Sequence, residues 1–229
     1  MASDEYTFKV QVGDKPNTRR GILSTTSSLY DPLGFVAPVT LLPKILLQRI
    51  SGGWDDEVAP SYVAQWNEWK DSLHCLKDFR IPRCYEQDSA GVHTQELHVF
   101  SDASESAYGA VVYLRQITSK GPQVSFILGK SRVAPKKTVT IPRLELNAAA
   151  VACKLAALVT KQIPLKPSDT TFWTDSMAVL RFIYNKHSRF KVFVANRLSI
   201  IHEFSQPKQW RYVNTKENPA DVASRGALP

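Results

Sequence analysis

The chain has 229 residues, of which 43% are hydrophobic and 22% charged, and its formal net charge is +8. This length and composition argue against a disordered chain, because the core can be large. They also argue against a disulfide framework or a cysteine-based zinc site, because the three cysteines are scattered and odd in number. No run approaches the roughly 18 apolar residues that span a bilayer, so we expect no membrane partner. The cysteine pattern favours an intracellular, reducing compartment.

The first 90 residues are expected to hold a flexible tail, residues 1–20, followed by a small, mainly helical region. The tail is polar and rich in turn formers. A helix is expected over residues 38–50, because Pro38 suits a first helical turn. Over residues 61–77 aromatic and aliphatic side chains recur at steps of three and four, which predicts an amphipathic helix with an aromatic stripe in the core. We place the end of the helical region near residue 90, in a polar loop.

Residues 91–229 change to a pattern of strands and helices. Three short strands come first, followed by a long helix, a strand, two helices, a strand and a last helix. The expected ranges are 96–101, 108–114, 124–128, 141–161, 170–174, 177–184, 189–204, 209–213 and a final helix from 218. Ser188 and Asn218 are expected to cap the helices that follow them. The predicted fold class is α/β, with a mixed five-stranded sheet of three antiparallel and two parallel strands flanked by helices.

The positive charge is confined to the second part of the chain. Residues 1–90 hold 10 basic and 12 acidic side chains, whereas residues 91–229 hold 19 basic and 9 acidic ones. This imbalance favours a polyanionic partner for the second part, although a basic surface kept for solubility produces the same counts.

Four carboxylates stand at strand ends and helix starts. Asp102 ends the first strand of the second part, and Asp175 ends the strand at 170–174, which can lie parallel and adjacent to it. Glu145 is one turn into the long helix, and Asp221 is in the first turn of the last helix. Each alone has an ordinary role, such as a turn residue or a solvated helix residue. Converging at one sheet edge, they would repel one another unless divalent cations neutralised them, and oxygen ligands favour Mg²⁺ or Mn²⁺.

Short segments around these carboxylates form a specific set. They are FSDAS (100–104), YGAV (108–111), TIPRLEL (140–146), WTDS (173–176) and ENPADVASRG (217–226). Together they resemble the retrotransposon branch of the ribonuclease H family. Two further segments, RGILS (20–24) and YDPLGF (30–35), narrow the resemblance to the Pol polyprotein of BEL/Pao-type LTR retrotransposons, in the stretch that joins the reverse transcriptase to its ribonuclease H.

The resemblance implies a connection region over residues 21–90 and a ribonuclease H-like domain over residues 91–229. It implies an endonuclease that cleaves the RNA strand of an RNA–DNA hybrid with two Mg²⁺ ions, for which Mn²⁺ can substitute. Asp102 would bridge the ions, Asp221 would help to hold the ion that activates water, and Glu145 and Asp175 would complete the shell of the other. Five side chains are candidates for contacts with the phosphate backbone: Lys130, Arg132, Lys136, Lys137 and Arg143.

The resemblance also implies a location in a cytoplasmic retrotransposon particle, with the polymerase part of Pol as a partner. One departure from the family leaves an alternative open. Many ribonuclease H enzymes have a histidine in the loop before the last aspartate, whereas residues 213–218 read VNTKEN. A catalytically inactive remnant that binds nucleic acid or docks to the polymerase is therefore the alternative, and the four intact carboxylates favour the active enzyme.

Overall fold

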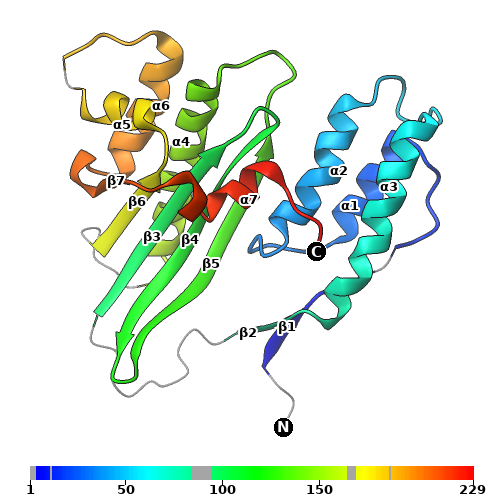
Figure 1. Cartoon of the computed structure of the whole chain (residues 1–229), viewed down its shortest axis with the longest axis horizontal. Helices are drawn as coiled ribbons and strands as arrows, with labels where there is room; N and C mark the ends of the chain where they lie inside the picture. The colour runs from blue at the N-terminus through cyan, green and yellow to red at the C-terminus, as the bar shows by residue number, and fades with distance from the viewer. Residues whose placement is uncertain (1–3, 11, 84–93, 164–168, 186) are drawn as a thin grey trace. The chain divides into compact units, whose positions relative to one another are not determined.

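The computed structural model describes residues 4–10, 12–83, 94–163, 169–185 and 187–229 (Figure 1). The chain forms two compact units. The first comprises Met1–Pro32, Val36–Gln87 and Gly226–Pro229, and the second comprises Leu33–Phe35 and Asp88–Arg225. The boundary expected near residue 90 lies outside the described residues.

The first unit is mainly helical and includes a two-stranded ribbon. Its elements are β1 (Glu5–Thr7), α1 (Arg19–Ser28), α2 (Ala37–Arg49), α3 (Pro60–Ser72), the 3-10 helix η1 (Leu73–Asp78) and β2 (Arg80–Pro82). Strands β1 and β2 pair antiparallel, with Tyr6 opposite Ile81. Within the predicted tail of residues 1–20, a partner distant in the sequence thus holds Glu5–Thr7 as a strand.

Helix α1 is absent from the sequence prediction. Its sequence, RRGILSTTSS, is rich in Ser and Thr, which have low helix propensity. Thr18 caps the helix, since its Oγ1 accepts a hydrogen bond from the Gly21 N–H at 3.1 Å, and Ile22 is fully buried. Capping and tertiary packing thus outweigh a weak local preference.

Helices α2 and α3 begin within a residue of their predicted starts and form the core of the first unit. The indoles of Trp66 and Trp69 stack at 5.0 Å and are both buried. The indole N–H of Trp69 donates a hydrogen bond to the Val39 carbonyl at 2.9 Å. The predicted aromatic stripe of α3 therefore lies in the core, as expected.

The second unit contains the predicted mixed sheet. Its strands are β3 (Thr94–Ala103), β4 (Ala107–Thr118), β5 (Gly121–Val133), β6 (Thr170–Thr174) and β7 (Trp210–Tyr212). Their spatial order is β5-β4-β3-β6-β7. Neighbours among β3, β4 and β5 are antiparallel, whereas β6 is parallel to both β3 and β7. Leu33 belongs to this unit because its carbonyl accepts a hydrogen bond from the Gly129 N–H at 2.8 Å.

Helices cover this sheet. They are α4 (Ile141–Thr160), α5 (Met177–Tyr184), α6 (Val192–Phe204) and α7 (Ala220–Arg225), with the 3-10 helices η3 (Pro207–Gln209) and η4 (Thr215–Glu217) between them. Helix α4 packs on β3 and β4, and α7 crosses the strands in front of the sheet in Figure 1. Among the described residues, no helix is both long and apolar enough to cross a membrane.

Two local predictions in this unit are wrong. Lys130 and Arg132 lie within β5, beyond the predicted end of this strand at residue 128, because pairing with β4 continues to Val133. Ser188 does not cap α6, which begins at Val192. Instead, the Ser188 N–H donates to Asn185 Oδ1 at 3.0 Å, and the Asn185 side-chain amide donates back to the Ser188 hydroxyl at 3.0 Å. The competing hydrogen bonds to Asn185 hold Ser188 in the turn after α5.

Gly109 in β4 allows α7 to approach the sheet. A Cβ atom at Gly109 would stand 2.8 Å from the Lys130 carbonyl oxygen and 2.9 Å from the Ala223 Cβ. Only glycine fits this approach without displacement of backbone. Because Gly109 is the cross-strand partner of Asp102, the approach brings α7 next to the carboxylate of Asp102.

Candidate metal centre

Two parallel strands place the first pair of carboxylates. Strands β3 and β6 pair from Leu97 opposite Thr170 to Ser101 opposite Thr174. Asp102 and Asp175 each follow the last of these pairs by one residue, so both stand at the same edge of the sheet. This position at the carboxyl ends of parallel strands is where α/β proteins commonly build their sites, and it matches the sequence prediction.

Glu145 joins this pair from the first turns of α4. One oxygen from each of Asp102, Glu145 and Asp175 lies within 4.8 Å of the other two. Oxygen ligands of an octahedral Mg²⁺ ion stand about 2.9 Å apart when adjacent and about 4.1 Å apart when opposite, because each bond is about 2.05 Å long. Small side-chain movements therefore suffice for the three carboxylates, which we call the acid cluster, to share a divalent cation.

Two of the three residues of the acid cluster are buried, and its carboxylates repel one another. Asp102 is 4% exposed and Glu145 is 8% exposed. Burial, with the charges of Asp102 and Asp175 as further causes, raises the pKa of Glu145 to about 9. Burial also raises the pKa of Asp102, and the charges of Asp175 and Asp221 add to this effect. The cluster therefore holds its negative charge at a free-energy cost that a bound cation would remove.

Two carboxylate oxygens of the acid cluster have no protein partner. Glu145 Oε2 and Asp175 Oδ1 are buried and receive no hydrogen bond from any residue that the structure describes. The remaining contacts orient these groups. The backbone of Ala103 forms a hydrogen bond with Glu145, and the Thr215 hydroxyl donates a hydrogen bond to Asp175 Oδ2 at 2.6 Å. Buried acceptors are rarely left without a partner. The donor set and the two unpartnered oxygens thus fit a hard divalent cation.

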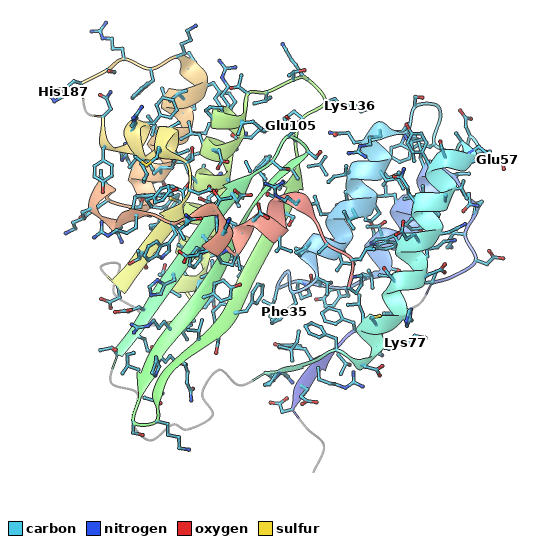
Figure 2. The ribbon with its side chains drawn as sticks, in the orientation of Figure 1. Phe35, Glu57, Lys77, Glu105, Lys136 and His187 are labelled. Carbon is cyan, nitrogen blue, oxygen red and sulfur yellow. The ribbon has the colours of Figure 1, made fainter. Side chains whose placement is uncertain are left out.

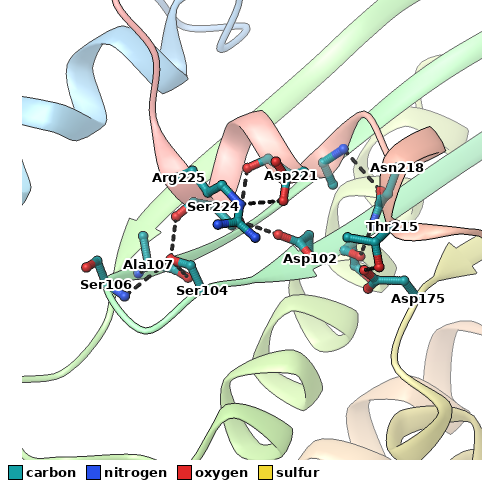
Figure 3. A network of polar contacts seen from close by, with 12 residues as sticks. Asp102, Ser104, Ser106, Ala107, Asp175, Thr215, Asn218, Asp221, Ser224 and Arg225 are labelled. Carbon is teal, nitrogen blue, oxygen red and sulfur yellow. Dashed lines mark hydrogen bonds and ion pairs between the residues drawn. The ribbon is translucent and has the colours of Figure 1, made fainter.

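Ser224 of α7 supports Asp102. Its side chain is fully buried, and its hydroxyl donates a hydrogen bond to Asp102 Oδ2 (Figure 3). Ser104, in the turn after β3, donates in turn to the Ser224 carbonyl oxygen at 2.7 Å. The role of Ser224 was not predicted from the sequence, although its place one helical turn after Asp221 was the available signal.

Asp221 lies next to the acid cluster but outside it. Its Oδ1 accepts a hydrogen bond from Arg225 Nε at 2.6 Å, which is an i,i+4 ion pair within α7 (Figure 3). Its charge contributes to the raised pKa of Asp102, so the two carboxylates are near each other. The structure therefore brings three of the four candidate ligands together and pairs the fourth with its own cation.

The loop before Asp221, which lacks a histidine, contributes two other polar groups. Thr215 bonds to Asp175 as described above. Asn218 donates from its side-chain amide to the Ser101 carbonyl at 3.1 Å, and its Oδ1 accepts from the Ala220 N–H at 3.1 Å. The predicted capping by Asn218 is thus confirmed, and the same side chain ties α7 to β3.

The five candidate phosphate contacts are all exposed. They occupy three places: β5 carries Lys130 and Arg132, the loop before α4 carries Lys136 (labelled in Figure 2) and Lys137, and the first turn of α4 carries Arg143. The guanidinium of Arg143 lies 5.2 Å from the centre of the Phe193 ring. Arg143 is two residues from Glu145, so it stands closest in the chain to the acid cluster.

Comparisons with known proteins give one family. The family described as Pao retrotransposon-like RNaseH-like domain matches residues 18–176, a stretch that includes the acid cluster and ends before Asp221. Among curated proteins, no sequence matches the chain.

Several solved structures are similar. The N-terminal RNase H domain of a Mycobacterium tuberculosis protein is 14% identical, with 57% of this chain and 91% of that one covered and a TM-score of 0.41. RNase H1 from Halobacterium salinarum is 14% identical, with 55% and 90% covered and a TM-score of 0.36. A foamy viral protease-reverse transcriptase in complex with an RNA/DNA hybrid is 15% identical, with 99% and 30% covered and a TM-score of 0.46.

Proposed function

Since this chain belongs to the family of Pao retrotransposon-like RNaseH-like domains, we propose that it is a Mg²⁺-dependent endonuclease that cleaves the RNA strand of RNA–DNA hybrids. The observation that carries the proposal is the acid cluster, in which three carboxylates converge and two buried oxygens have no partner among the described residues. The family supplies the nuclease fold, and the cluster supplies the ligands that metal-dependent phosphodiester hydrolysis requires.

The chain's carboxylates have distinct parts in this proposal. Asp102, Glu145 and Asp175 would hold Mg²⁺ or Mn²⁺, and Asp221 would join them for a second ion. Two bound ions would stabilise the charge that develops on the attacking and leaving oxygens. Ser224 holds one oxygen of Asp102 by a hydrogen bond, so the ligand is oriented before the substrate arrives.

The charge of the second part of the chain supports a nucleic-acid substrate. A buried cluster of carboxylates repels a polyanion, whereas the 19 basic side chains of residues 91–229 outnumber the 9 acidic ones and attract it. Arg143 and the cations of β5 and the following loop would contact phosphates. We propose that residues 91–229 act as the catalytic domain and residues 21–90 as a connection to the polymerase part of a Pol polyprotein, within a cytoplasmic retrotransposon particle.

The ion pair between Asp221 and Arg225 favours a second candidate function. With Asp221 neutralised by Arg225, the site offers three carboxylates instead of four. A chain in this state would bind hybrid nucleic acid without cleaving it. The two candidates differ in one measurable property, which is cleavage that depends on a divalent metal.

The test uses the pure full-length chain and an end-labelled RNA–DNA hybrid, with Mg²⁺, with Mn²⁺ and with EDTA. The active enzyme cleaves the RNA strand in either metal, leaves a 3′-hydroxyl and a 5′-phosphate, and does nothing in EDTA. Single-stranded RNA and duplex DNA of the same sequence are the control substrates and should stay intact. If the hybrid is bound but stays uncut at every metal concentration, the nuclease proposal is wrong and the binding candidate replaces it.

A further inference from the structure

A basic groove of about 320 Å³ lies along α4, between β5 and α6. Four cationic side chains line it: Lys130 and Arg132 from β5, Lys154 from α4 and Arg197 from α6. No acidic residue is among the residues that line it. The groove lies within the second unit, and two of its cations, Lys154 and Arg197, have no part in the proposed hydrolysis.

The charges of the four cations are not balanced by ion pairs in the part of the chain that the structure describes. Within the described ranges of the chain, none of them forms an ion pair with a carboxylate. A basic surface kept for solubility is usually interspersed with acidic groups, whereas these side chains come from three elements to one hollow. Between them the helix exposes apolar surface, including Leu158, which is 52% exposed. Like charges gathered around one hollow favour an anionic ligand.

Arg197 is held in place at the wall of this groove. Its Nε donates to Asn147 Oδ1 at 2.9 Å, and its guanidinium lies 4.0 Å from the centre of the Phe193 ring. Arg143 approaches the same ring at 5.2 Å. Arg143 and Arg197 therefore meet at the Phe193 ring, which links the basic groove to the first turn of α4. Positive charge thus lies on the outward face of α4 both at its first turn and in the groove.

We propose that the basic groove binds the phosphate backbone of the hybrid beyond the site of cleavage. This inference rests on the proposed function for the identity of the nucleic acid. Helix α4 rises 1.5 Å and turns 100° per residue, so Lys154 lies about 14 Å along the helix from Glu145 and on its opposite face. Stacked base pairs are separated by about 3.4 Å, so a hybrid must extend at least about four base pairs from the cut to reach the groove. The fixed guanidinium of Arg197 suits a phosphate, since it presents a fork of donors to two oxygens.

The test measures binding of a fluorescent hybrid to the full chain in EDTA over a range of salt concentrations. Lys154→Glu should weaken binding about tenfold, and the slope of log affinity against log salt should become less steep by about one. The matched control is Lys208→Glu, because Lys208 is exposed on η3 outside the groove; this variant should bind within twofold of the parent chain. Arg132→Gln, which removes a groove charge without reversing it, should show a smaller loss in the same direction.

Substrate length gives a second arm. A hybrid that extends fewer than about four base pairs to either side of the cut should bind the parent chain and Lys154→Glu equally. Equal weakening by Lys154→Glu and Lys208→Glu would show a general charge effect and overturn the inference. If Lys154→Glu weakened the binding of polyglutamate more than that of the hybrid, the groove would be a site for an acidic protein segment. That result would also overturn the inference.

The two proposals fail separately, because binding is measured without metal. If Lys154→Glu weakens hybrid binding and the chain never cleaves the hybrid, the groove proposal stands and the nuclease proposal is wrong. If the chain cleaves in Mg²⁺ and Lys154→Glu leaves hybrid binding unchanged, the nuclease proposal stands and the groove proposal is wrong. Circular dichroism of the exposed-site variants checks that each remains folded.

Discussion

Helix α4 carries two sites of opposite charge, and they differ most in burial. Near its start, Glu145 is 8% exposed and its pKa is raised to about 9. Farther along, Lys154 is exposed and lines a groove without acidic residues. A buried charge interacts strongly with protons, ions and its neighbours, whereas an exposed one is screened by salt. The acid cluster should therefore respond to metal and pH, and the basic groove to ionic strength.

The largest effect is expected from Asp102→Asn. Loss of this ligand should lower the rate of hybrid cleavage about a thousandfold or more, because metal ions contribute several kcal/mol of charge stabilisation to such reactions. Binding of the hybrid in EDTA should be unchanged or tighter, since one repulsive charge is gone. Single-turnover kinetics and fluorescence anisotropy measure the two quantities. The control is Glu203→Gln on the exposed side of α6, and an equal loss of activity there would contradict a specific role for Asp102.

Ser224→Ala should have the next largest effect. The variant removes the hydrogen bond that orients Asp102, and loss of such a support typically costs 10- to 100-fold in metal affinity. We expect the Mg²⁺ concentration for half-maximal cleavage to rise by about that factor, with a smaller change in the rate at saturating metal. Ser188→Ala, in the turn after α5, is the matched control. An unchanged Mg²⁺ requirement for Ser224→Ala would show that the hydrogen bond does not prepare the site.

The pH dependence of stability distinguishes the acid cluster from the exposed groove. In the folded, metal-free protein the pKa of Glu145 is raised to about 9 from its ordinary value of 4.5. The folded state therefore holds the proton more tightly than the unfolded chain. The stability from the protonated side chain is complete below about pH 4.5 and is lost as the pH rises toward 9.

Glu145→Gln should reduce the loss of folding stability at high pH, because a neutral amide replaces the carboxyl group at all pH values. Melting temperatures in EDTA between pH 5 and pH 9 measure it, and each kcal/mol recovered should raise the melting temperature by about 2 to 4 °C. Saturating Mg²⁺ should stabilise the parent chain most at high pH. Parallel pH profiles for the parent and the variant would contradict the assignment.

The smallest effect is expected from Arg225→Gln. Its ion pair with Asp221 is largely exposed, since the Arg225 side chain is 63% exposed, and pairs of this kind are worth about 0 to 1 kcal/mol. If Asp221 must leave Arg225 to bind metal, the variant should need up to about fivefold less Mg²⁺ for half-maximal cleavage. A higher Mg²⁺ requirement would instead mean that Arg225 helps to form the site.

Much of the second unit was predictable from local patterns. The alternation of apolar residues and the hairpin spacing predict β3 to β5, and the strand β6 has the predicted bounds. Because Asp102 and Asp175 follow strands that the topology makes parallel neighbours, their proximity follows from the sequence as well. The same holds for Glu145, whose place in the first turns of α4 depends on a proline near the helix start.

The remaining features depend on contacts between distant residues or on a choice of partner. Strand β1 exists because β2 pairs with it, and no local pattern encodes that pairing. Asp221 is predictable as a helix-start acid, but its orientation depends on competition between Arg225 and the acid cluster. Lys154 is visible in the sequence only as an interruption of an apolar helix. Only the fold brings Lys154 together with Arg197 of α6 and the cations of β5 in the same groove.

The last described residues return to the first unit after the second is complete. The Ala227 N–H donates to the Pro38 carbonyl at 3.4 Å, and Gly226 has a positive φ of 79° where a Cβ would stand 2.7 Å from Leu42 Cδ2. In chain order the second unit is thus an insertion within the first. A ribosome must translate the whole second unit before α2 receives its final packing partners, so the helical unit that is started first should finish folding last.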